Sequence, residues 1–225
     1  MTDMFKQIIK AILRKIFARN IDALVIPDGI QVVSFDLYDT LIVRKTGRPE
    51  NVFGEIERII HERQNSHEEF FSKRRIQAER SARKKKKAEI TLDDIYDELR
   101  SIDKCNYEEL KSLEVQTEFE VSIPKPEAID KLKQILRCGM TVIITSDMYL
   151  PKETIEMIIR KCGITGYKDL YVSSECGVTK KSGKLFKYIL GDKEISANEM
   201  IHIGDNPIGD YYVPRKIGIK AFLCK

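Results

Sequence analysis

Short apolar runs that end in polar residues recur along this chain and predict the strands of a sheet. The first run, Gln31 to Phe35, is rich in β-branched residues and leads directly into Asp36. Further strands are expected at residues 140–145, 170–172, 200–203 and 219–223. Apolar residues at helical spacing occupy the intervals between them, at 128–137, 151–162, 184–190 and 208–216. Strands that alternate with helices predict an α/β fold with a doubly wound, parallel, five-stranded sheet.

Residues 4–19 predict a basic amphipathic helix. Its apolar stripe consists of Phe5, Ile8, Ile9, Ile12, Leu13, Ile16 and Phe17, and its other faces carry Lys6, Lys10, Arg14, Lys15 and Arg19. Such a helix can lie on an anionic membrane surface or dock on a protein partner. Packing of the stripe on the protein's own core accounts for the pattern equally well. We assign residues 1–30 to this helix and a linker.

A long charged segment separates the first two predicted strands. Residues 47–122 are almost entirely helical in pattern and predict a cap inserted into a core made of residues 31–46 and 123–225. Thr91 and Asp94 resemble a capping box at the start of a helix over residues 93–100. The basic run from Arg83 to Lys87 can attract a polyanionic ligand, although lysine runs on helices are ordinarily just solvated. We expect the cap to lie over the strand ends.

Composition limits the partners and the compartment. With 39 basic and 35 acidic residues, the net charge of +4 gives no reason to expect nucleic acid binding. The five cysteines are scattered without a CxxC pair, which argues against a zinc site and favours a reducing compartment. The sequence contains no apolar run of about 18 residues that would span a membrane. We expect a cytoplasmic protein, peripheral at the inner face of the membrane if the amphipathic helix binds lipid.

Polar residues at the ends of the predicted strands carry a family resemblance. The segment Phe35-Asp36-Leu37-Tyr38-Asp39-Thr40-Leu41 resembles the first signature of the haloacid dehalogenase superfamily. Ser146 matches the second signature, a lysine of Lys180-Lys181 followed by Gly183 and Phe186 matches the third, and Gly204-Asp205-Asn206-Pro207-Ile208-Gly209-Asp210 matches the fourth. Arg44, Ser146-Asp147-Met148 and Ser173-Ser174-Glu175 are similar to a bacterial subgroup often associated with surface-polysaccharide glycosyltransferases. The resemblance implies a Rossmann-like core with a helical cap of the first type.

The resemblance also implies a Mg²⁺-dependent hydrolase of the phosphatase type, acting on a small phosphorylated metabolite such as a sugar phosphate. Asp36 would attack phosphorus and form an aspartyl-phosphate, which divides one difficult displacement into two easier ones. Asp36 and Asp205 would be the carboxylate ligands of Mg²⁺, with Asp210 as a third ligand or a support. Lys180, with Lys181 as an alternative, and Ser146 would stabilise the phosphoryl charge. Thr40 would act near the nucleophile, and Asp147 and Arg44 would help to bind substrate.

Tyr38 departs from the phosphatase pattern of the superfamily. Phosphatases normally carry an aspartate at this position, which protonates the leaving group and then activates water. A phenol with a pKa near 10 is a poor general acid at neutral pH. Asp39 is the candidate substitute if the loop turns it inward.

Two rival functions stay open at this point. Tyrosine at the position of Tyr38 also occurs in the carbon–halogen dehalogenases of the superfamily, which need no metal. A catalytically weak binding or scaffolding module in polysaccharide biosynthesis is the second rival. His202 lies inside a predicted strand and is expected to be a buried core histidine.

Overall fold

A parallel five-stranded sheet forms the centre of the protein. The computed structural model describes residues 3–64, 71–86, 88–101 and 107–225. The sheet strands are β1 (Val32–Asp36), β4 (Thr141–Ser146), β5 (Asp169–Val172), β6 (Met200–Gly204) and β7 (Lys220–Leu223). They run in the order β5-β4-β1-β6-β7, and every neighbouring pair is parallel. The predicted fold class is therefore confirmed, and each predicted strand is present.

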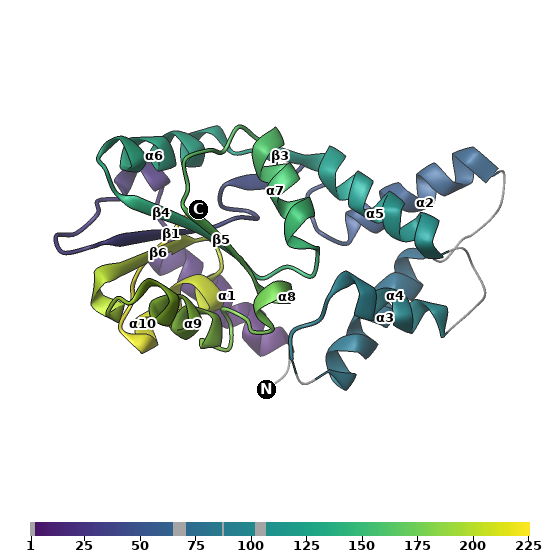
Figure 1. The fold of residues 1–225 in the computed structure, drawn as a ribbon. Helices are drawn as coiled ribbons and strands as arrows, with labels where there is room; N and C mark the ends of the chain where they lie inside the picture. Colours follow the sequence, from purple (N-terminus) through teal and green to yellow (C-terminus); the bar gives the residue numbers. More distant parts are fainter. Residues whose placement is uncertain (1–2, 65–70, 87, 102–106) are drawn as a thin grey trace.

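Helices cover both faces of the sheet (Figure 1). The helices are α6 (Pro126–Arg137) and α7 (Lys152–Lys161) on one face, and α9 (Lys184–Lys193) and α10 (Val213–Ile217) on the other. Side chains of β1 alternate between the two layers, since Phe35 belongs to the apolar cluster of α6 and α7 whereas Val32 belongs to that of α9. This two-sided burial explains why apolar residues predominate on both faces of the strands instead of alternating with polar ones.

Short elements join the strands to the helices. They are a 3-10 helix η1 (Ile21–Ala23), α8 (Ser173–Cys176), a second 3-10 helix η2 (Ala197–Glu199) and a π-helix η3 (Pro207–Tyr212). The short helix expected near residues 208–216 is present, although its first part is π-helical: η3 continues directly into α10, and Tyr212 and Val213 at the junction keep helical backbone angles. Pro214 lies in the first turn of α10, where its missing N–H is tolerated.

Residues 47–122 fold into four described helices. These are α2 (Asn51–Gln64), α3 (Phe71–Lys85), α4 (Leu92–Arg100) and α5 (Tyr107–Val121). At their base, β2 (Ile42–Arg44) and β3 (Ser122–Pro124) form an antiparallel two-stranded sheet that the sequence pattern did not reveal. Backbone N–H groups of Leu92 and Glu89 donate to the carbonyl oxygens of Tyr149 and Gly177. Both acceptors come after strands of the main sheet, so this helical segment lies beyond the carboxyl ends of β4 and β5 (Figure 1).

The basic run of the helical segment is largely neutralised. Arg83 pairs with Glu79 and Glu89, Lys85 pairs with Glu98, and Lys86 pairs with Asp94. Lys87 lies outside the described residues. These contacts favour the solvated-surface interpretation of the run over a site for a polyanionic ligand.

A buried ion pair inside the helical segment is expected to control its stability. The fully buried Arg75 guanidinium donates to both carboxylate oxygens of Glu114, at 2.7 and 2.6 Å. Arg75→Met would leave Glu114 buried without a cation, so we expect the free energy of unfolding to fall by about 3–5 kcal/mol. Arg100→Met is the control, because the described ion pairs of Arg100, with Asp97 and Glu108, are exposed and worth about 1 kcal/mol at most. Equal losses in urea unfolding of the two variants would contradict this expectation.

The N-terminal helix, α1 (Asp3–Phe17), lies outside the core. Its residues Ile8, Ile12 and Ile16 are exposed, so the stripe as a whole is not packed on the protein's core. The chain is pinned just after α1, where Arg19 N–H donates to the Leu223 carbonyl and Lys225 N–H donates to the Arg19 carbonyl. Over the described ranges, no helix combines the length and apolar character needed to cross a bilayer.

Candidate active site

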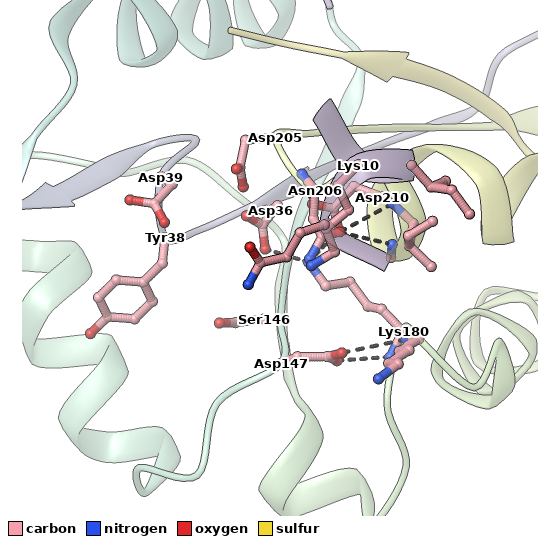
Figure 2. A pocket seen from close by; sticks show the side chains of 15 residues that line it. Lys10, Asp36, Tyr38, Asp39, Ser146, Asp147, Lys180, Asp205, Asn206 and Asp210 are labelled. Atoms are coloured by element: carbon pink, nitrogen blue, oxygen red, sulfur yellow. Dashed lines mark hydrogen bonds and ion pairs between the residues drawn. The ribbon is translucent and has the colours of Figure 1, made fainter. Parts of the chain in front are cut away.

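A pocket of about 690 Å³ opens at the carboxyl ends of β1, β4 and β6. Its lining includes most of the residues that the sequence singled out: Asp36, Tyr38, Asp39, Ser146, Asp147, Lys180, Lys181, Asp205 and Asp210 (Figure 2). Thr40 is buried against Asp36, and Arg44 does not belong to the pocket lining. Strand ends that are far apart in the sequence therefore converge on one site, as expected for a doubly wound sheet.

Asp36 lies at the floor of the pocket between a cation and a hydroxyl group. The Nζ of Lys180 forms an ion pair with Asp36 and a second one, at 2.7 Å, with Asp210. Thr40 Oγ1 donates to Asp36 Oδ2 over 3.1 Å. Burial raises the pKa of Asp36 well above its ordinary value, and Lys180 opposes this shift. Asp36 therefore depends on nearby positive charge to stay ionised and nucleophilic.

Lys180, rather than Lys181, occupies the site beside Asp36. Its side chain is buried, and although burial alone would lower the Lys180 pKa, Asp210 and Asp36 raise it, so the lysine is fully protonated. Asp147 accepts hydrogen bonds from the backbone N–H groups of Lys180, at 2.7 Å, and Lys181, at 3.4 Å. Asp147, predicted to bind substrate, thus holds the loop that delivers Lys180 to the nucleophile.

The end of β6 places two more carboxylates beside Asp36. One oxygen from each of Asp36, Asp205 and Asp210 lies within 4.8 Å of the others. The Asp210 carboxylate packs directly on Gly204, where an added Cβ would approach the Asp210 side chain to 2.5 Å. Asn206 accepts from the N–H groups of Ile208 and Gly209 and so begins the π-helix that turns Asp210 back towards the strand.

A buried hydrogen-bond network, which the sequence did not predict, holds Asp210 in place. His202 Nε2 lies 3.2 Å from Asp210 Oδ1, and His202 Nδ1 lies 2.8 Å from the hydroxyl of Ser34. Although burial raises the pKa of Asp210, Lys180 and His202 outweigh it and hold that pKa below its ordinary value. Because an ionised carboxylate only accepts, His202 donates through Nε2 and accepts from Ser34. His202 is buried, as expected, and it also orients a site residue.

The three carboxylates fit a divalent cation. Carboxylate oxygens are the ligands that Mg²⁺ prefers, and opposite ligands of an octahedral Mg²⁺ lie about 4.2 Å apart. A contraction of well under 1 Å, by this estimate, would bring the observed 4.8 Å cluster to that spacing. The Asp210 carboxylate already accepts hydrogen bonds from Lys180, His202 and the backbone N–H of Asn206. About one of its four lone-pair sites is therefore left for a metal. Asp36 and Asp205 are therefore the better-placed ligands.

Tyr38 and Arg44 form a separate contact beside the pocket. The Arg44 guanidinium lies 3.9 Å from the centre of the Tyr38 ring and makes a buried ion pair with Glu118 at 2.6 Å. Figure 2 shows the Tyr38 ring directed away from Asp36. Burial first, and the Glu118 charge second, raise the pKa of Tyr38 well above its ordinary value. The structure therefore does not bring Arg44 to the nucleophile.

Asp39 faces the pocket, the less common of its two expected orientations. The loop after Asp36 reverses at this residue, whose backbone φ of 63° lies in the left-handed region. Aspartate adopts this conformation more readily than most residues. Asp39 is exposed, lines the pocket and adds to the negative charge around Asp205. It is thus available for proton transfer in a way that Tyr38 is not.

The N-terminal helix contributes residues to the pocket that the sequence did not assign to it. Gln7, Ile9 and Lys10 are part of the lining, and Figure 2 draws Lys10 beside the acidic cluster. Arg14 Nη2 donates to Asp205 Oδ2 over 2.6 Å. Most of the chain separates these residues from Asp205, so no local pattern indicates the contact.

A family model for haloacid dehalogenase-like hydrolases matches residues 30–217 of this chain. This range holds all four signatures. The chain belongs to the haloacid dehalogenase-like hydrolase family. The frog Xenopus laevis "haloacid dehalogenase-like hydrolase domain-containing protein 3" is 25% identical over 99 residues, which cover 44% of this chain and 39% of that relative. The matched region thus spans about two fifths of the relative's length.

Solved structures of the family share its fold. A Bacteroides thetaiotaomicron family enzyme, in complex with magnesium and inorganic phosphate, aligns with a TM-score of 0.58 at 17% identity over 87% of this chain and 94% of its own. A 2-haloacid dehalogenase from Pseudomonas syringae aligns with a TM-score of 0.59 at 19% identity over 84% of each chain. At these identities the likeness shows the fold alone, and both metal-binding enzymes and dehalogenases adopt it.

If Asp36 and Asp205 hold a divalent cation such as Mg²⁺, the affinity for that cation is expected to fall as the pH drops through about 6. Burial, with help from Asp210 and Asp39, raises the pKa of Asp205 to about 6, and the raised pKa of Asp36 acts in the same direction. A protonated carboxyl group does not ligate the metal, so each pH unit below this pKa weakens binding about tenfold. Titration calorimetry between about pH 5 and 8 measures the dependence. Asp39→Asn should move the midpoint to lower pH, whereas a flat profile would exclude Asp205.

Proposed function

We propose that this hydrolase is a Mg²⁺-dependent phosphatase that transfers the phosphoryl group of a small phosphorylated metabolite to Asp36. Sugar phosphates are among the candidate substrates. The observation that carries the proposal is the cluster of Asp36, Asp205 and Asp210 around Lys180. Lys180 and Arg14 together bring two positive charges to the three carboxylates, which leaves an excess of negative charge that a divalent cation offsets. A dehalogenase has no use for this excess, since it binds no metal.

Each residue of the cluster has a distinct part in the proposed reaction. The bound cation supplies the positive charge that lets a phosphate approach a carboxylate. Asp36 attacks phosphorus, a new oxygen–phosphorus bond forms, and the ester oxygen leaves with its electron pair. Lys180 and the hydroxyl of Ser146 stabilise charge on the phosphoryl oxygens. Water then hydrolyses the aspartyl-phosphate and returns Asp36 as a carboxylate.

Supporting contacts hold these groups in place before substrate arrives. Thr40 fixes one oxygen of Asp36, Asp147 fixes the loop of Lys180, and His202 fixes Asp210. Such preorganisation lowers the cost of arranging charge in the transition state. We further propose that the helical segment 47–122 acts as a cap whose closure excludes water from the phosphoryl-enzyme.

A panel of phosphate esters tests the proposal. The panel contains sugar phosphates, an aryl phosphate and an acyl phosphate, each assayed with Mg²⁺ and with a chelator, and phosphate release is measured. We expect turnover that requires Mg²⁺ and that Lys180→Met reduces by at least about 10²-fold, while Lys181→Met has little effect. Turnover that survives the chelator would refute the proposed metal dependence.

Dehalogenation is the second candidate because Tyr38 occupies the position of the usual acid. A halide leaves without protonation, so this chemistry tolerates tyrosine there. Halide release from 2-haloacids in the presence of a chelator would favour it over phosphoryl transfer. If neither phosphate nor halide is released but the protein binds Mg²⁺ tightly, the result would instead favour the binding or scaffolding module.

The proposed location is the cytoplasm. The described cysteines Cys138, Cys162, Cys176 and Cys224 are all free thiols, which suits a reducing compartment. The family resemblance adds a proposed association with a glycosyltransferase, for which the N-terminal helix is the candidate contact.

A further inference from the structure

Helix α1 divides its apolar stripe between the protein and solvent. On the inner side, Ile9 and Leu13 are half-buried and the Phe17 ring stacks on Tyr211 with ring centres 5.3 Å apart. On the outer side, Ile8, Ile12 and Ile16 recur every four residues and are 48%, 50% and 62% exposed. Four-residue spacing places these three isoleucines on one face of the helix. These three side chains are therefore about half exposed to solvent while α1 is docked.

The charge around the outer face indicates what can cover it. Lys15 and Arg19 are exposed near the three isoleucines, and Lys10 is exposed closer to the pocket. Asp3 is the only acidic residue in the sequence from residue 3 to residue 19. An apolar stripe bordered by cations is typical of helices that lie in the surface of an anionic lipid bilayer. An apolar protein groove would match the isoleucines but would not account for the cations.

The inner face of α1 contacts the proposed metal site. Arg14 donates to Asp205 Oδ2 over 2.6 Å and lies 3.4 Å from the Asp205 carbonyl oxygen. A guanidinium on this carboxylate supplies positive charge that would otherwise come from the cation. Gln7, Ile9 and Lys10 of the same helix line the pocket. Docked α1 therefore opposes metal binding and forms part of the wall of the pocket that holds Asp36.

We propose that α1 binds the surface of an anionic lipid bilayer and that this binding withdraws Arg14 from Asp205. A bilayer can take up both halves of the stripe only if Ile9, Leu13 and Phe17 leave the protein, so lipid binding favours the undocked helix. The backbone hydrogen bonds of Arg19 to the end of β7 keep the helix tethered beside the pocket. Because coupling between two ligands is reciprocal, the bilayer and Mg²⁺ strengthen each other's binding. The inference rests on the proposed metal site but not on the proposed reaction.

Vesicle sedimentation tests the lipid part. Wild-type protein should bind vesicles that contain phosphatidylglycerol, less so as salt rises, and should bind pure phosphatidylcholine vesicles weakly. Ile12→Gln should weaken binding by about tenfold. Met157→Gln is the matched control, because Met157 is 48% exposed on α7, far from α1 in the sequence, and its replacement should have no effect. Failure to bind anionic vesicles, or a dimer that Ile12→Gln abolishes, would overturn the proposal.

Calorimetry of Mg²⁺ binding tests the coupling. Arg14→Gln should raise Mg²⁺ affinity by about two- to fivefold without vesicles, the size expected for a partly exposed ion pair, and vesicles should then add nothing. Anionic vesicles should raise the affinity of the wild type by a similar factor. Lys15→Gln removes the same charge from the same helix without touching the Arg14–Asp205 pair. It should leave Mg²⁺ affinity unchanged and weaken vesicle binding about fivefold.

The controls separate the two proposals. Calorimetry of the Asp205→Asn protein with vesicles measures the background signal from Mg²⁺ that binds to the lipid itself. If the protein binds Mg²⁺ but neither vesicles nor the Arg14→Gln substitution changes its Mg²⁺ affinity, the coupling is overturned and the proposed function is left intact. Absence of Mg²⁺ binding in every form would overturn the metal site, and with it both proposals.

Discussion

Asp36→Asn is expected to lower kcat by about 10⁴-fold or more while the protein stays folded. Loss of an attacking group removes the covalent route, and effects of this size are usual for such substitutions. The amide keeps the shape of the carboxyl group. Lys180 keeps its ion pair with Asp210, so the substitution leaves no unpaired cation in the pocket. Phosphate release measures the loss, and circular dichroism verifies the fold.

Trapping of the covalent intermediate sharpens this test. With labelled substrate, rapid acid quenching should recover label on wild-type protein and none on Asp36→Asn. Thermal unfolding should show no loss of stability, because the raised pKa of Asp36 means that burial of its charge is unfavourable. A folded Asp36→Asn protein that still turns over substrate would remove Asp36 from the role of nucleophile.

Local chemistry made part of the fold and site predictable. Each strand that ends in a polar residue could be identified from the switch between apolar and polar positions. The Thr91 capping box begins α4 as expected, with Asp94 returning the hydrogen bond, because capping depends on residues only three apart. Asp36, Ser146 and Asp205 line one pocket because parallel strands place their carboxyl ends on one edge of a sheet.

Contacts between distant segments account for the features that could not be predicted. The β2–β3 ladder pairs residues 42–44 with 122–124, and three-residue strands are too short to show a period. Arg44 was predicted from the sequence to help bind substrate, but its guanidinium forms a buried ion pair with Glu118 in α5. Arg14 reaches Asp205 across 191 positions, which no local pattern encodes. Such pairings depend on how whole elements pack, and that packing is decided by tertiary structure.

Tyr38→Asp is expected to accelerate hydrolysis of ordinary alkyl phosphates by about 10²- to 10⁴-fold, the usual contribution of a general acid. The wild type has no carboxylic acid at this position. The pKa of the buried Tyr38 phenol is raised well above its ordinary value, which makes it a still poorer proton donor. Wild-type rates should therefore depend steeply on the pKa of the leaving group. Acyl, aryl and anomeric sugar phosphates should react much faster than alkyl phosphates.

The matched control is Tyr38→Asn. Either replacement removes the ring under Arg44 and leaves Arg44 paired with Glu118, so the two variants share any structural damage. Only Tyr38→Asp adds an acid, and only it should flatten the dependence on leaving-group pKa. Rates are compared at saturating substrate under single-turnover conditions, so that product release does not hide the chemical step.

Asp39 is the next candidate acid if the wild type already cleaves alkyl and aryl phosphates at similar rates. Another residue would then supply the proton, and Asp39 is exposed on the wall of the same pocket. In that case Asp39→Asn should slow alkyl phosphates selectively and leave acyl phosphates nearly unchanged, since acyl phosphates leave without protonation. Equal slowing of both classes would point instead to the electrostatic influence of Asp39 on Asp205. The ratio of the two rates therefore distinguishes a proton donor from a residue that only tunes the metal site.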